Sequence, residues 1–87
     1  MIERRVRIRN DLGIHLRAAG VVVQVAGKFE ADIWLERDGA RATAKSIMSV
    51  LSLAAGRGVE LKILASGTDA DQAVAAIADL IEGGFEE

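Results

Sequence analysis

Residues 59–84 read VELKILASGTDADQAVAAIADLIEGG, and the spacing of apolar residues changes within this stretch. In residues 59–66 every second residue is apolar, which is the period of a strand with one buried face. Further on, the apolar residues recur with the period of a helix; they are Val74, Ile77, Leu80 and Ile81. Thr68 or Asp69 can cap this helix. The stretch therefore predicts a strand followed by an amphipathic helix.

The beginning of the chain shows the same strand pattern. Residues 2–9, IERRVRIR, place Ile2, Val6 and Ile8 on one face and charged residues mostly on the other. This alternation predicts a half-buried strand, and the NDLG of residues 10–13 predicts a turn after it. We interpret the basic side chains of this strand as a solvated sheet surface.

A second amphipathic helix is predicted for residues 16–26. Its apolar residues have helical spacing; they are Ala19, Val22, Val23 and Ala26. Because valine is only a modest helix former, packing against the rest of the protein must hold this helix.

Residues 31–44, ADIWLERDGARATA, predict a β-hairpin. Asp38 and Gly39 are the turn signal, and residues 40–44 form a short polar return strand that is typical of a sheet edge. Ser46 then provides an N-cap for a third, short helix. The apolar positions expected in that helix are Ile47, Val50, Leu51 and Ala54, and Gly56 and Gly58 end it.

These elements follow one another in the order β-α-β-β-α-β-α. Every strand alternates, so every strand has one wet face, and helices are expected to cover only one side of the sheet. The sequence therefore predicts a two-layer α/β sandwich of the α+β kind, built from a single domain of residues 1–87. Trp34 alternates with Ile33 and Leu35, and we expect it on the open face of the sheet.

The composition excludes several kinds of site. The chain has no cysteine and one histidine, so we expect no disulfide, no metal site and no bound cofactor. Its 11 basic and 13 acidic residues give a net charge of −2, which argues against binding to nucleic acid. No apolar run has the length of a membrane span and no signal-peptide pattern is present, so we expect a cytoplasmic protein without membrane insertion.

The single histidine, His15, stands at the predicted start of helix 16–26, and Arg17 follows two residues later. The first N–H groups of a helix have no intrahelical acceptors, and the helix dipole adds about half a positive charge there. This environment attracts phosphate and disfavours a charged imidazole, and a neutral imidazole is a nucleophile. The Arg17 guanidinium can hold phosphate oxygens. His15 and Arg17 together therefore predict a site at which a phosphoryl group is attached.

The plainer interpretation is that His15 is a weak helix cap and Arg17 a surface charge. Spacing alone favours this interpretation, because two residues near a helix start are not specific. A cation at a helix N-terminus, however, opposes the helix dipole. Such a local conflict is typical of functional sites, so both interpretations stay open on these residues alone.

Three longer stretches of the sequence resemble one known family. They are LGIHLRAAGVVVQVAGKFEADIWLE (12–36), KSIMSVLSLAAGRGVELKILASG (45–67) and TDADQAVAAIADLI (68–81). Over nearly the whole chain they are similar to HPr, the phosphocarrier family of the bacterial phosphoenolpyruvate-dependent sugar phosphotransferase system. The resemblance implies an open-faced β-sandwich with an antiparallel four-stranded sheet, in the order 1-4-2-3, covered on one face by three helices.

The resemblance also implies a role for the histidine. His15 would accept a phosphoryl group on Nδ1 from enzyme I, which takes it from phosphoenolpyruvate, and would pass it to an A-type enzyme II component during sugar transport. Arg17 and the backbone N–H groups of Leu16, Arg17 and Ala18 would contact the phosphate. The commonest family motif reads His-Ala-Arg-Pro, so Leu16 and Ala18 are departures, which we expect to affect partner choice and transfer rate more than the chemistry.

Two further family features fall on residues of this chain. Ser46 matches the serine that an ATP-dependent HPr kinase/phosphorylase modifies in many members, although Ser46 could equally be only a helix cap. The partners of the family dock on an apolar surface beside the histidine, which corresponds here to Gly20, Ile47, Met48 and Leu51. For Met48 and Leu51, ordinary core packing is the alternative.

The leading hypothesis is a monomeric histidine phosphocarrier whose catalysis is completed by partner proteins rather than a stand-alone enzyme. The alternative is a regulatory relative of the same fold that acts mainly by binding a kinase or a transcription factor. A generic ferredoxin-like binding module is a third hypothesis. The charge and the scarcity of aromatic residues argue against a nucleic-acid version of it.

Overall fold

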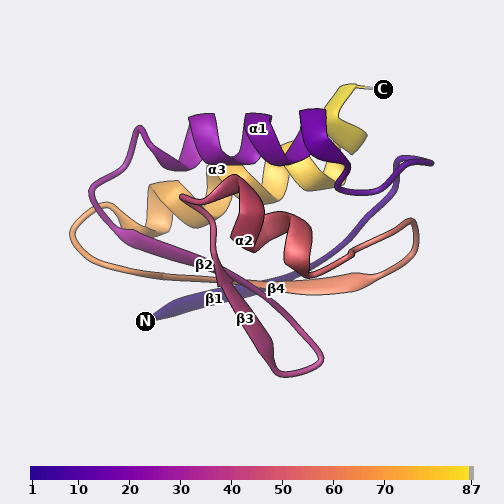
Figure 1. Cartoon of the computed structure of the whole chain (residues 1–87). Helices are drawn as coiled ribbons and strands as arrows, with labels where there is room; N and C mark the ends of the chain where they lie inside the picture. The colour runs from indigo at the N-terminus through magenta and orange to yellow at the C-terminus, as the bar shows by residue number, and fades with distance from the viewer. Residues whose placement is uncertain (87) are drawn as a thin grey trace.

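The computed structural model describes residues 1–86, and its elements follow the predicted order (Figure 1). They are β1 (Ile2–Arg7), α1 (Leu16–Ala26), β2 (Asp32–Arg37), β3 (Ala40–Thr43), α2 (Ile47–Ser52), β4 (Glu60–Ser66), α3 (Ala70–Glu82) and a short 3₁₀ turn, η1 (Gly84–Glu86). The sequence did not predict η1. Among these elements, no helix has both the length and the apolar character needed to cross a bilayer.

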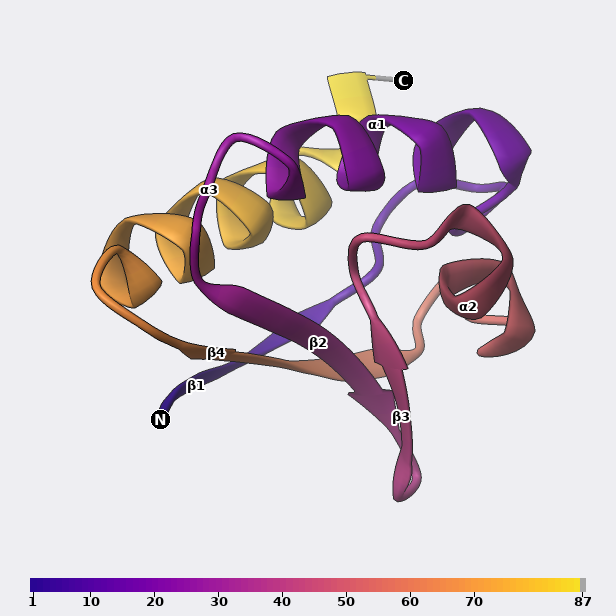
Figure 2. The same ribbon diagram turned by 60° about the vertical axis from the view of Figure 1, so that its left-hand side comes forward.

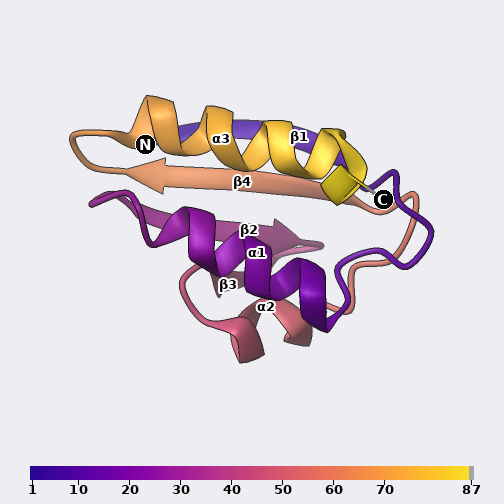
Figure 3. The same cartoon turned by 90° about the horizontal axis from the view of Figure 1, so that it is seen from above.

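The four strands form one antiparallel sheet in the order β1-β4-β2-β3. Seen from above, α3 lies over β1 and β4, α1 runs beside α3 over β2, and α2 lies next to β3 (Figure 3). All three helices therefore cover the same face of the sheet, and the other face is open. The predicted fold class, an open-faced sandwich with the strand order 1-4-2-3, is confirmed.

The core lies between the helices and the covered face of the sheet. Its largest fully buried side chains are Ile8, Val22, Ile33, Leu35, Val50, Leu61, Ile63, Ile77 and Ile81. The alternation read from the sequence gives these faces correctly, since Ile33 and Leu35 of β2 pack beneath the helices. Small residues such as Ala19 and Ala73 have no exposed surface, so the helices approach the sheet closely.

The open face of the sheet is less exposed to solvent than the alternation predicts. Leu64 lies on this face of β4, opposite Trp34 of β2, and only 2% of its surface is exposed. Trp34 is half-buried there, and the guanidinium carbon of Arg41 lies 5.8 Å from the centre of its ring. Ile2 lies on the covered face with Val6, as the alternation predicts, but it is 39% exposed at the end of the sheet.

The end of α2 also differs from the prediction. Ala54 was expected on the buried face of this helix, but the helix ends at Ser52 and Ala54 is exposed with φ 49°. Leu53 takes the buried place instead and is 7% exposed. The left-handed backbone at Ala54 turns the chain back toward the sheet, which a helical period cannot reveal.

The cap of α3 is a second local difference. Asp69 is the N-cap by position, but its carboxylate makes no cap hydrogen bond to its own helix. It accepts hydrogen bonds from the N–H groups of Glu30 (2.9 Å) and Ala31 (2.8 Å), in the loop between α1 and β2. These two bonds hold the pKa of Asp69 below its ordinary value. Lys45 holds the same loop by donating from Nζ to the carbonyl oxygen of Phe29 (2.8 Å).

Candidate functional site

His15 is the N-cap of α1. Its backbone is extended (φ −80°, ψ −177°), and its carbonyl oxygen accepts the first hydrogen bond of the helix from the N–H of Ala19 (2.8 Å). Its imidazole makes no cap hydrogen bond to the helix, and the residue is partly exposed. The plain interpretation of His15 as a side-chain cap is therefore not supported, and the ring is not buried in the core.

The residues after His15 form the opening turn of α1. Leu16 and Arg17 are exposed, whereas Ala18 is buried against the core. The N–H groups of a first helical turn point along the axis away from the helix and have no intrahelical acceptors. The structure therefore brings the four consecutive residues of the predicted phosphate site to one exposed helix end, where an anion is stabilised by about 0.3–1 kcal/mol.

The backbone before His15 is held against the chain that leaves α2. The N–H of Ile14 donates to the carbonyl oxygen of Ala55 (2.9 Å). Gly13 has φ 63°, and a Cβ placed there would lie 2.5 Å from the same carbonyl oxygen and 2.6 Å from the Cα of Gly56. Only glycine combines this backbone with so close an approach.

The turn that leads into Gly13 is closed by Asn10, which is 6% exposed. The side-chain Nδ2 of Asn10 donates to the backbone carbonyl oxygen of Gly13 (2.8 Å). The backbone carbonyl oxygen of Asn10 accepts from the N–H of Gly13 (3.2 Å). Arg57 also donates to Asp11 (2.7 Å), which joins the loop between α2 and β4 to the loop between β1 and α1. Asn10 and Gly13 were predicted as the two ends of a turn but not as supports of the site, although a glycine two residues before a helix cap is a usable signal of tight backbone.

Ser46 is the N-cap of α2, as predicted. Its Oγ accepts a hydrogen bond from the N–H of Ser49 (3.2 Å), and the residue is partly buried. The first turn of α2 holds no acidic residue. A phosphate on Ser46 would therefore meet a helix N-terminus rather than a neighbouring carboxylate.

Helices α1 and α2 pack against each other (Figure 2), and both carry exposed apolar side chains. We call the apolar patch the surface of Leu16, Gly20, Ile47, Met48 and Leu51. Leu16 is 67% exposed and Met48 75%, whereas Ile47 is 37% exposed and Leu51 is partly buried. Gly20 is partly exposed, with open space where a side chain would stand. Core packing therefore does not account for Met48, and it accounts for Leu51 only in part.

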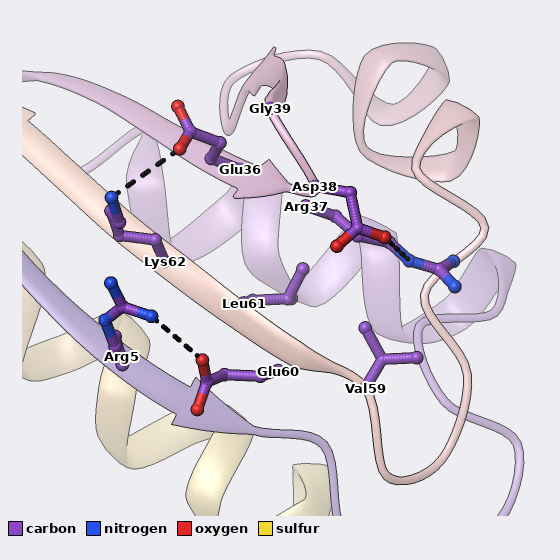
Figure 4. Close-up of a pocket in the computed structure, with 9 residues that line it drawn as sticks. All are labelled: Arg5, Glu36, Arg37, Asp38, Gly39, Val59, Glu60, Leu61 and Lys62. Carbon is purple, nitrogen blue, oxygen red and sulfur yellow. Dashed lines mark hydrogen bonds and ion pairs between the residues drawn. The ribbon is translucent and has the colours of Figure 1, made fainter.

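The open face of the sheet holds a hollow of about 420 Å³, which is lined by charged residues (Figure 4). Its charges form pairs within the chain, since Arg5 bonds Glu60 (3.1 Å) and Lys62 lies 3.7 Å from Glu36. Their mutual neutralisation leaves no strong field for a charged ligand. Within residues 1–86, no three His, Cys, Asp or Glu side chains are grouped so that they could hold a metal ion.

The chain is similar to proteins of one known family over nearly its whole length. The family model described as "PTS HPr component phosphorylation site" matches residues 2–83. The phosphocarrier protein HPr of Treponema pallidum is 44% identical over 87 residues, which are all of this chain and 99% of that protein. The HPr-like protein Crh of Bacillus subtilis is 37% identical over 82 residues, which are 94% of this chain and 96% of Crh.

A crystal structure of HPr from Thermoanaerobacter tengcongensis superimposes with a TM-score of 0.96. The two chains are 42% identical, and the match covers 100% of this chain and 98% of the other. A dimer of HPr from the same organism has also been solved, and it matches with a TM-score of 0.80 over the full length of both chains.

Proposed function

This chain belongs to the HPr family of phosphocarriers, and from that premise we propose that it relays a phosphoryl group through His15. Phosphorylated enzyme I would be the donor, and an A-type enzyme II component of a sugar transporter would be the acceptor. We propose that the protein works in the cytoplasm as a monomer, without bound cofactor and without a nucleic-acid or membrane partner.

The observation that carries this proposal is the position of the imidazole. His15 is the N-cap of α1 and is partly exposed, and its side chain makes no cap hydrogen bond to the helix, so the imidazole lies at the helix end where an anion is favoured. In the forward step, the Nδ1 lone pair attacks phosphorus and forms the N–P bond. The bond from phosphorus to its donor group on enzyme I breaks, and that electron pair returns to the donor. Nε2 keeps its proton, and the second transfer is the same exchange with His15 as the leaving group.

The opening turn would hold the phosphoryl oxygens during both steps. The backbone N–H groups of Leu16, Arg17 and Ala18 occupy the first three positions of α1, where anions are favoured. The Arg17 side chain is exposed and would supply a permanent positive charge beside them. Ala18 replaces the usual proline and therefore adds an N–H group at this end of the helix.

The apolar patch would be the docking surface for enzyme I and for the enzyme II component. Two exposed large side chains, Leu16 and Met48, offer flexible apolar contact of the kind that serves several partners. Leu16 stands directly beside the nucleophile, where alanine is usual. We propose that its bulk selects among partners and shields the N–P bond from water.

Ser46 would be a regulatory site for a kinase that uses ATP. A phosphate on this N-cap suits the helix it caps, so regulation would act through charge at the docking surface rather than through unfolding. Ser46 is the residue before Ile47 of the apolar patch, so the added charge would lie where an acidic partner approaches.

A second candidate function is a regulatory role in which binding dominates over sugar transport. The similarity to Crh supports it, because Crh matches nearly the full length of this chain. His15 and Arg17 together favour the carrier, since a purely binding protein has no need of a nucleophile at this helix end. We therefore place the carrier first.

One labelling experiment tests the carrier. Wild-type protein incubated with enzyme I and phosphoenolpyruvate should gain one acid-labile phosphate, detected by intact mass before and after acid treatment. The variant His15→Ala should gain none, and Ser46→Ala should be labelled like the wild type. A wild-type protein that stays unlabelled by its cognate enzyme I would defeat the proposal. In a separate reaction with the cognate kinase and ATP, label that persists in Ser46→Ala would exclude Ser46.

A further inference from the structure

The side chain of Arg37 connects the β2–β3 hairpin to the far end of α2. Arg37 is the last residue of β2 and shares the covered face of the sheet with Ile33 and Leu35. Its Nη1 donates to the carbonyl oxygens of Leu53 (3.0 Å) and Ala54 (2.7 Å). Figure 4 shows this side chain extending from the strand toward the segment between α2 and β4.

The two carbonyl groups belong to a turn that needs such support. The last carbonyl groups of a helix have no intrahelical donors, and a cation near them also complements the helix dipole. The helix is only six residues long, and Ala54 has the left-handed backbone that costs a non-glycine residue free energy. One guanidinium nitrogen that binds both oxygens fixes this conformation.

The turn at residues 53–55 holds the backbone that leads into the proposed phosphate site. Ala55, the residue after the two Arg37 acceptors, accepts the N–H of Ile14, and Gly13 packs directly on the same backbone. His15 follows Ile14. A short series of contacts therefore runs from Arg37 through residues 53–55 to the backbone that carries the nucleophile.

We propose that Arg37 is a positioning residue for phosphoryl transfer, acting on His15 through the 53–55 turn. This inference rests on the proposed function. Without Arg37 the turn loosens, and His15 is presented in many orientations rather than one, so the transfer step slows. Docking should change little, because Arg37 does not belong to the apolar patch and bonds the carbonyl oxygens of Leu53 and Ala54, beyond the end of α2.

The test compares Arg37→Met with Arg5→Met. Arg37→Met keeps an unbranched, flexible side chain, although a shorter one, and removes its donors. Arg5→Met removes the same charge from the opposite, open face of the sheet, where Arg5 donates to Glu60 (3.1 Å). Arg37→Lys is the conservative variant, since its ammonium group carries three donors. Transfer from phosphorylated enzyme I is measured with each folded variant as the varied substrate.

We expect Arg37→Met to lower kcat about tenfold and to leave KM within about twofold. Arg37→Lys should recover a large part of the loss, and Arg5→Met should behave like the wild type. A normal kcat in Arg37→Met, a rise in KM alone, or an equal loss in Arg5→Met would overturn the inference. Should Arg37→Met unfold, Arg37→Gln, whose amide is too short to reach both oxygens, takes its place with the same expectations.

Amide hydrogen exchange separates this inference from the proposed function. Exchange at the Ile14 N–H should become at least about tenfold faster in Arg37→Met, whereas exchange in β4 should stay unchanged. Unchanged Ile14 exchange would show that Arg37 does not hold the 53–55 turn against the Ile14 backbone, whether or not enzyme I labels the protein. A wild-type protein that enzyme I does not label, with Ile14 exchange that still depends on Arg37, would instead defeat the proposed function and leave only the structural link from Arg37 to the Ile14 backbone.

Discussion

The N–H of Ile14 donates a 2.9 Å hydrogen bond to the carbonyl oxygen of Ala55, so the residue before His15 is bound to the chain that leaves α2. This bond joins two residues that lie 41 positions apart in sequence (55 − 14). It connects the backbone before α1 to the backbone after α2, the two helices that carry the proposed phosphate site and the apolar patch. Disturbing the bond should therefore affect stability and transfer together.

Gly13→Ala is the sharpest test of that contact. The new Cβ would lie 2.5 Å from the Ala55 oxygen, and φ at this position is 63°. We expect a loss of about 3 kcal/mol in the free energy of unfolding, measured by urea titration, together with slower transfer. Gly39→Ala is the matched control, because φ there is 84° and nothing lies within 4 Å. Gly39→Ala should lower the free energy of unfolding by only about 1–2 kcal/mol. Equal losses in the two variants would contradict the role given to the contact between Gly13 and Ala55.

Asp69 should make stability depend on pH. Hydrogen bonds from the Glu30 and Ala31 N–H groups lower the pKa of Asp69 in the folded state below its ordinary value of 3.8. The stabilisation is therefore present above the unfolded pKa and is lost as the pH falls through the folded pKa. Thermal unfolding from pH 7 to pH 3 should show Asp69→Asn with a flatter decline than the wild type. An Asp69→Asn variant whose stability declines as steeply as that of the wild type would contradict this role.

Ser46 variants separate capping from charge. Because Ser46 Oγ accepts from the Ser49 N–H, Ser46→Ala should lower the free energy of unfolding by about 0.5–2 kcal/mol without lowering the transfer rate of the folded protein. Ser46→Asp keeps an acceptor at the cap, so its stability should stay near that of the wild type. Its negative charge should nevertheless raise KM for enzyme I. Rapid transfer by Ser46→Asp would argue against regulation through this residue.

Met48 should matter for docking and not for folding. Its side chain is 75% exposed, so Met48→Ala should change the free energy of unfolding by no more than about 0.5 kcal/mol. If Met48 anchors a partner, the same change should weaken binding to enzyme I by more than about 1 kcal/mol, measured by calorimetry. Ile2→Ala removes an exposed apolar residue at the far end of the sheet and should leave binding unchanged.

The fold was predictable because the local signals agree with one another. Alternation placed Leu61, Ile63 and Ala65 on the buried face of β4, and the structure confirms it. Asp38 and Gly39 were predicted as a tight hairpin turn, and both have positive φ, 49° and 84°. Each of these features depends on a few neighbouring residues, which a sequence displays directly.

The misses share a different cause. Ala54 was assigned to α2 because apolar spacing continues past the point where the helix ends. The bonds of Arg37 and Asp69 reach 16 or more residues along the chain, and no local pattern contains them. At the candidate site, the position of His15 at the helix start followed from the sequence, but its support by Asn10, Gly13 and Ala55 required knowing which loops meet.

Trp34, the only tryptophan of the chain, stands on the open face of the sheet, opposite Leu64, across the fold from the helices that bear the proposed phosphate site. Its natural fluorescence should therefore report whether β2 and β4 are still paired. A protein that docks on α1 and α2 should leave that emission unaltered. Trp34 emission should thus report unfolding without responding to partner binding, so that unfolding and binding can be measured separately in one sample.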